Sequence, residues 1–293
     1  MRNGDEMRIH LPHPSFDSHF HALEMINRGV DAATAVAAAR QAGLVGALDA
    51  AVDEANFDRR STFAGQVGGI LLSVGIHPSS TAVERGIWRD RFDIVWNQIA
   101  CPGVVAVGET GLDFYRDHSP HEIQEKAFRD HLDLAAETGR PVIVHNRNAD
   151  DRVLALIRES RCRHGVFHCF SSDWETARRA LDLGFYVSFA GNITYAKTEV
   201  LRNAAARIPE DRLLAETDAP FLSPAPVRGR ANHPGHIGYT LEALADIRKT
   251  DPFVIAECTV ENARNLFGPP SGRGSPSAGP VIPAVRDFRA GLF

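Results

Sequence analysis

The chain has 293 residues, of which 44% are hydrophobic and 24% charged, and 32 Lys and Arg against 37 Asp and Glu give a formal net charge of −5 at pH 7. This is ordinary globular composition, enough for one large domain or two small ones. The charge argues against a general positive field for nucleic acid or an anionic membrane, so an anionic substrate would be held locally, by a metal ion or a few arginines.

Several function classes are excluded by absent features. The four cysteines form no Cys-x-x-Cys pair, which argues against a zinc ribbon, a redox motif or a disulfide framework. No apolar stretch reaches the ~18 residues that span a bilayer, and the N-terminus lacks the apolar core of a signal peptide. We therefore expect a cytoplasmic protein with no membrane partner, as a monomer or weak oligomer.

Apolar runs alternate with helical segments along the whole chain. Asp31 is a typical helix N-cap, and Gly43 is a typical stop signal for the helix that follows it. We predict a first strand leading into His19 and His21, followed by strands at 44–52, 69–74, 104–107, 142–144, 166–167, 185–189 and 213–215. We predict helices at 31–43, after 52, and at 90–99, 120–139, 149–160, 173–183, 198–207, 240–249 and 252–266.

Strict alternation of strands and helices predicts a parallel sheet with helical crossovers. Eight units over about 250 residues match a (βα)8 or TIM barrel, whose active site lies at the C-terminal ends of the strands. The alternative is an open doubly wound sheet, which would have a glycine-rich phosphate turn where this chain has histidines. We predict an α/β TIM barrel over 16–267, with a lead-in at 1–15 and a Gly-, Pro- and Ser-rich tail at 268–293.

Metal-competent side chains follow the predicted strands. His19 and His21 share one face of the first strand, because side chains alternate along a strand. The other candidates come after the fourth, fifth, sixth and eighth strands: Glu109, His145, His168 and Asp218. Of the remaining histidines, we expect solvated loop or helix positions for His10, His13, His118, His121, His131 and His164.

Six ligands are too many for one tetrahedral ion with an open position, so the sequence predicts two divalent ions. Nitrogen and oxygen ligands do not distinguish Mg, Mn, Zn and Fe. We expect Glu109 to bridge the ions and Asp218 to take a proton from the attacking water, which makes these two the candidate catalytic residues. Such a site hydrolyses esters, most naturally phosphodiesters.

Several residues near the predicted barrel mouth are candidate substrate contacts. His77 precedes Pro78 and either contacts substrate or shapes the turn. Arginine binds phosphate through paired N–H groups, although for Arg116 a surface ion pair with Asp117 or Glu122 is the alternative. The candidate phosphate contacts are Arg116, Arg147 and Arg230. The candidate base-stacking residues, for which packing is the alternative, are Phe114, Tyr115 and Phe170.

The ordered motifs resemble those of the TatD family of metal-dependent deoxyribonucleases. They are Asp17-Ser18-His19-Phe20-His21, Gly75-Ile76-His77-Pro78, Gly108-Glu109-Thr110-Gly111-Leu112-Asp113-Phe114-Tyr115-Arg116, Pro141-Val142-Ile143-Val144-His145, Phe167-His168-Cys169-Phe170 and Glu216-Thr217-Asp218-Ala219-Pro220-Phe221-Leu222. The resemblance implies a TIM barrel of the metal-dependent hydrolase type and the same six metal ligands. It also implies DNase activity that is usually 3′→5′ exonucleolytic and best on single strands. One departure is Ala231, which replaces a basic residue before Asn232.

Two other readings of the same residues remain. The binuclear site could serve another ester or amide, such as an aminoacyl ester on RNA, a lactone or a small phosphoester, because function on a barrel depends on its loops. A non-catalytic scaffold that has kept the fold would be expected to have lost ligands, and all six are present. The leading prediction is a metal-dependent deoxyribonuclease with single-stranded DNA as substrate.

Overall fold

The computed structural model describes residues 11–12, 14–82, 88–116 and 118–268. Most of the expected lead-in, including His10 and His13, and the expected tail from 269 onward lie outside the described residues. Of the lead-in residues that are described, Leu11 is 6% exposed and packs in the hydrophobic core. No helix in the described ranges is long and apolar enough to cross a membrane.

Eight strands form one sheet in the order of the sequence, and each neighbouring pair is parallel. The strands are β1 (Ser15–Phe20), β2 (Leu44–Asp49), β3 (Ile70–Val74), β4 (Val104–Asp113), β5 (Val142–Arg147), β6 (Gly165–Phe167), β7 (Tyr186–Phe189) and β8 (Leu213–Ala215). This arrangement confirms the predicted TIM barrel.

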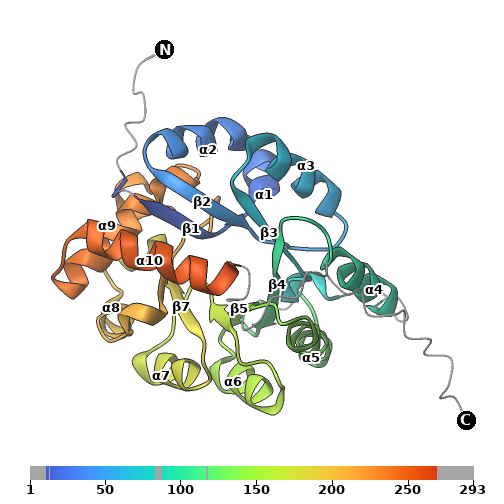
Figure 1. The fold of residues 1–293 in the computed structure, drawn as a ribbon. Helices are drawn as coiled ribbons and strands as arrows, with labels where there is room; N and C mark the ends of the chain where they lie inside the picture. Colours follow the sequence, from blue (N-terminus) through green and yellow to red (C-terminus); the bar gives the residue numbers. More distant parts are fainter. Residues whose placement is uncertain (1–10, 13, 83–87, 117, 269–293) are drawn as a thin grey trace, which may run out of the picture.

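Helices surround the strands in a ring (Figure 1). They are α1 (Ala22–Asn27), α2 (Ala32–Gln41), α3 (Phe57–Val67), α4 (Trp88–Gln98), α5 (His121–Thr138), α6 (Asp150–Glu159), α7 (Trp174–Asp182), α8 (Glu199–Ala205), α9 (Ile237–Arg248) and α10 (Pro252–Phe267). The predicted cap is present, since the Asp31 carboxylate accepts a hydrogen bond from Thr34 N at 3.0 Å. The short helix α1 was not predicted, because it begins directly after His21 without a recognisable start signal.

The barrel interior is filled by side chains from its strands. The apolar side chains that meet there are Leu48, Ala106, Ile143, Val166 and Leu214, and the last turns of α10 pack against them. Phe267 of α10 stacks on Phe16 near the start of β1, with ring centroids 6.5 Å apart. α10 therefore covers the N-terminal end of the strands, and in Figure 1 it crosses in front of them. This leaves the opposite, C-terminal end for the site.

The barrel closes between β8 and β1 through the residues that follow β8. A parallel bridge joins Phe20 to Ala219. Beside it, His21 N donates to Ala219 O at 2.8 Å, and Asp218 N donates to His19 O at 2.9 Å. The hydrogen bonds that close the barrel thus also bring His19, His21 and Asp218 together.

A buried aspartate side chain strengthens the same seam. Asp17 is fully buried and accepts hydrogen bonds from Thr217 N at 2.8 Å and from Thr217 Oγ1 at 2.6 Å. Burial raises the pKa of Asp17 to about 8, against the lowering effect of these bonds. Asp17 therefore holds Thr217, the residue directly before Asp218, in place.

β4 is longer than the sequence predicts, since it continues to Asp113 rather than ending at 107. Gly108 and Gly111 interrupt the apolar pattern of this segment, so that its sequence is typical of a loop. Gly111 has a φ of +141°, and a Cβ there would lie 2.0 Å from the carbonyl oxygen of His145. Only glycine allows this close approach, which holds Glu109 of β4 against the histidine of β5.

The expectation that His131 is solvated is wrong. His131 is fully buried on the inner face of α5, where its Nε2 accepts from Ile76 N at 3.1 Å and its Nδ1 donates to Ala127 O at 2.7 Å. Burial lowers its pKa to about 4. The spacing of three residues to the buried Phe128 and Leu134, which puts all three on one helix face, is the signal that could have revealed this.

Candidate metal centre

Glu109 lies at the centre of the predicted cluster, and its two carboxylate oxygens face different histidines. Glu109 Oε2 lies 3.3 Å from His19 Nε2 and 3.5 Å from His21 Nε2. Asp218 completes this first group, with its Oδ1 3.5 Å from His21 Nε2 and 3.9 Å from His19 Nε2. All four side chains are buried or nearly so.

The second group surrounds the other oxygen of the same carboxylate. Glu109 Oε1 lies 2.7 Å from His145 Nδ1 and 2.8 Å from His168 Nε2. These two nitrogens are 3.4 Å apart. Strand ends far apart in the sequence therefore bring all six predicted ligands together, with two histidines and Asp218 in one group, two histidines in the other, and Glu109 between the groups.

The hydrogen bonds behind two of the histidines fix their tautomers. His21 Nδ1 donates to the carbonyl of Ala50 at 3.1 Å. His168 Nδ1 donates at 3.2 Å to Glu216 Oε1, which also accepts from Cys169 N. In its neutral form each ring carries its proton on Nδ1 and turns the lone pair of its Nε2 toward the Glu109 carboxylate. Without a cation there, a second proton on Nε2 takes its place.

Lone pairs that face a carboxylate repel it unless a cation or protons lie between them. Neutral imidazole nitrogens and carboxylate oxygens are the donors that bind divalent ions such as Zn and Mn in proteins. The tautomers of His21 and His168 therefore fit a pair of divalent ions, one on each side of Glu109.

The electrostatics of the site follow from the same contacts. Burial opposes ionisation of Glu109, but the surrounding histidines, His168 foremost, hold its pKa well below the usual range. Burial likewise opposes ionisation of Asp218, and the hydrogen bond from His21 lowers its pKa. Burial disfavours the charged form of His168, yet the carboxylates of Glu109 and Glu216 raise its pKa well above the ordinary value. Both acidic groups are thus ionised at neutral pH.

Glu216 was not predicted as part of the site. It is fully buried, and within the described residues its Oε2 has no hydrogen-bond partner. Carboxylates that hold the second nitrogen of a ligand histidine orient the ring and raise its basicity. The available signal was its position two residues before Asp218, which places both on the same face at the strand end.

The structure brings His77 close to the second group, 3.3 Å from both Glu109 Oε1 and His145 Nδ1. Its Nδ1 accepts a hydrogen bond from Ser79 N at 3.0 Å. The proton of the neutral ring is therefore on Nε2, which makes His77 a donor at this position rather than a ligand.

The three arginines predicted to contact phosphate differ in exposure and in the side chains that they contact. Arg147 stacks over the ring of Tyr115, with Cζ 4.0 Å from the ring centroid. Arg116 and Arg230 are exposed on the turns after β4 and β8, and within the described ranges neither forms a hydrogen bond or ion pair with the cluster.

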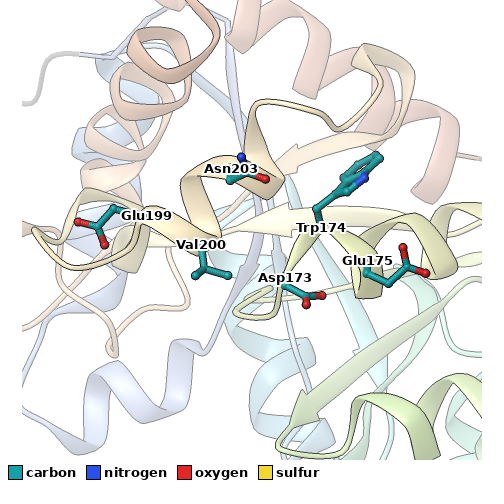
Figure 2. A pocket seen from close by; sticks show the side chains of 6 residues that line it. All are labelled: Asp173, Trp174, Glu175, Glu199, Val200 and Asn203. Carbon is teal, nitrogen blue, oxygen red and sulfur yellow. The ribbon is translucent and has the colours of Figure 1, made fainter.

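A hollow on the surface lies apart from this cluster. It is lined by side chains of α7, α8 and the residue before α7: Asp173, Trp174, Glu175, Glu199, Val200 and Asn203 (Figure 2). It contains none of the predicted site residues, and its acidic lining does not suit an anionic substrate.

The barrel and its buried histidine and carboxylate cluster define a metal-dependent hydrolase. The chain belongs to the TatD family, because the family model described as TatD related DNase matches residues 16–268.

Named relatives agree with this assignment. The uncharacterized metal-dependent hydrolase YcfH of Escherichia coli K12 is 37% identical over 259 residues, which cover 86% of this chain and 94% of that protein. The 3′-5′ ssDNA/RNA exonuclease TatD of Klebsiella pneumoniae is 33% identical over 241 residues, 80% of this chain and 90% of that protein. The crystal structure of YjjV, a TatD homologue of E. coli K12, matches with a TM-score of 0.78 at 26% identity, covering 89% of this chain and all of YjjV.

Proposed function

We propose that this protein is a divalent-metal-dependent deoxyribonuclease that removes nucleotides from the 3′ end of single-stranded DNA. The observation that carries the proposal is the position of Glu109, whose two oxygens face separate histidine groups at 2.7–3.5 Å. A 3′-5′ ssDNA/RNA exonuclease among the relatives at 33% identity supports the choice of substrate.

The chain's own residues would hold two ions in the mouth of the barrel. His19, His21 and Asp218 would hold the first ion, and Glu109 would bridge it to the second. His145 and His168 would complete the second ion's ligands. When bound, such a pair lowers the pKa of a water molecule and neutralises charge on a phosphodiester during in-line displacement.

In this proposal Asp218 accepts the proton of the attacking water. Its carboxylate is ionised at neutral pH, since its pKa is lowered by the hydrogen bond with His21 despite burial. The left-handed backbone of Asp218, with φ of 53°, aims the side chain toward His21 and His19. A general base must lie within hydrogen-bond reach of its proton, and the attacking water would lie within this group.

His77 and the arginines act on the substrate in this proposal. His77 donates from Nε2 toward the second ion's side of the site, where a phosphate oxygen would lie. Arg147 follows His145 by two residues and is half-buried, so its guanidinium can pair with a phosphate near the ions. Arg116 and Arg230 are further out and would meet phosphates away from the scissile bond.

The test is a time course on a 5′-labelled single-stranded oligonucleotide, with Mg²⁺, Mn²⁺ or Zn²⁺ added to metal-stripped protein. We expect a metal-dependent ladder that shortens from the 3′ end and is absent with His145→Ala. Failure to cleave with any ion, despite bound metal, would overturn the DNA substrate and favour a small ester or aminoacyl-RNA. Cleavage by the variant at the wild-type rate would overturn the site itself.

A further inference from the structure

Two arginine–aromatic pairs stand on opposite sides of the metal centre. In the first pair, Arg147, the last residue of β5, covers Tyr115 in the loop after β4, with Cζ 4.0 Å from the ring centroid. In the second, Arg28 at the end of α1 covers Phe221, in the loop after β8, at 4.6 Å. Because the strands follow one another in order around the barrel, β4 and β5 lie across its diameter from β8 and β1.

Each pair is connected to a different group of proposed ligands. The ring of Phe221 meets His21 edge-on, with centroids 5.9 Å apart. On the other side, Tyr115 N donates to Asp113 Oδ1 at 3.0 Å, and Asp113 Oδ2 lies 3.5 Å from His145 Nε2. A line from one pair to the other therefore passes over both halves of the Glu109 site.

The arginines of these pairs have no carboxylate partner among the described residues. Several other arginines are paired with carboxylates, as Arg152 is with Glu125 and Arg178 with Glu175. Arg28 and Arg147 instead rest on rings, so their N–H groups remain available to phosphate, and the guanidinium planes and rings offer stacking surfaces. Tyr115 is 63% exposed even beneath Arg147.

We propose that these pairs are two nucleobase-stacking subsites, Tyr115 with Arg147 and Phe221 with Arg28, which hold the two nucleotides that flank the scissile phosphate. This inference rests on the proposed nuclease function and specifies how its substrate lies. Aromatic rings stack any unpaired base, whereas the bases of a duplex are already stacked on one another. The two subsites thus favour single strands with little preference for sequence.

The experiment combines Tyr115→Leu and Phe221→Leu with oligonucleotides that lack the base on one side or the other of the scissile phosphate. Stacking contributes about 1–3 kcal/mol per base, so each variant should lower kcat/KM on the intact strand by about 5- to 150-fold. Removing the matching base should lower the wild-type value by a similar factor and have little further effect on the variant, because the lost contact is the same.

Two controls separate the possible failures. Trp174→Leu removes a ring that Arg207 covers at 5.7 Å on the outer helices, and should leave oligonucleotide cleavage unchanged. Hydrolysis of a small abasic phosphodiester, which has no ring to stack, should lose much less than cleavage of the intact strand in Tyr115→Leu and Phe221→Leu. Titration with Mn²⁺ shows that each variant is folded and keeps its ions.

The outcomes are distinct for the two proposals. Additive effects of ring and base removal, or equal losses on the small diester, would overturn the stacking subsites while leaving the nuclease intact. Absence of wild-type activity on the oligonucleotide and the small diester alike would instead overturn the proposed function.

Discussion

Replacing Glu216 by glutamine tests whether this buried carboxylate supports the metal centre. Its Oε1 accepts from His168 Nδ1 at 3.2 Å and from Cys169 N at 2.9 Å, in a fully buried position. Glutamine preserves the shape but removes the charge that orients His168 and raises its basicity. Loss of such a partner lowers metal affinity about 10- to 100-fold, or about 1.4–2.7 kcal/mol.

The assay is a calorimetric titration of metal-stripped protein with Mn²⁺ or Zn²⁺. We expect two ions per chain for the wild type, and selective weakening of the ion held by His168 in Glu216→Gln. The matched control is Glu54→Gln, because Glu54 is also buried and pairs with Arg91 away from the site. Unchanged affinity for both ions in Glu216→Gln, or an equal loss in Glu54→Gln, would refute the reasoning.

Three further predictions concern the bridge, the fold and the response to acid. Glu109→Gln should abolish metal-dependent oligonucleotide cleavage with an unchanged circular dichroism spectrum, because the bridging charge is lost; wild-type cleavage would contradict this. Gly111→Ala should destabilise by more than about 2 kcal/mol in urea unfolding, since its Cβ would meet His145 O at 2.0 Å, and a neutral result would contradict that contact. The pKa of His131 is lowered from 6.5 to about 4, so the stability it contributes is present above pH 6.5 and declines by about 3 kcal/mol as the pH falls to 4. Urea unfolding of His131→Leu should show a shallower decline over this range, and an identical slope would contradict the assignment.

Local patterns were sufficient to predict the fold class and the cluster. Apolar residues recur with the period of a helix or a strand, which backbone geometry dictates. Parallel strands in a barrel bring their C-terminal ends to one mouth. His19, Glu109 and Asp218 could therefore be predicted to meet although they lie far apart in the sequence. Their distances of 3.3–3.9 Å now show which atoms face one another.

Features that depend on tertiary contacts were missed. The extension of β4 was missed because Gly111 reads as a loop residue in the sequence. Its real cause is the close approach of the β4 backbone to His145 of β5. The burial of His131 depends on a partner in a distant loop, the backbone of Ile76. The role of Glu216 depends on its contact with His168, which lies 48 residues away in the sequence. Single-sequence patterns record periodicity and chemistry, but they do not record which elements pack together.

The most direct test of the central claim is the anomalous difference map of a crystal of this protein soaked in Mn²⁺. We predict two peaks about 3.5–4 Å apart, one beside each carboxylate oxygen of Glu109. One would lie near His19, His21 and Asp218, and the other near His145 and His168. A single peak, or peaks that do not share Glu109, would contradict the account of a carboxylate-bridged pair.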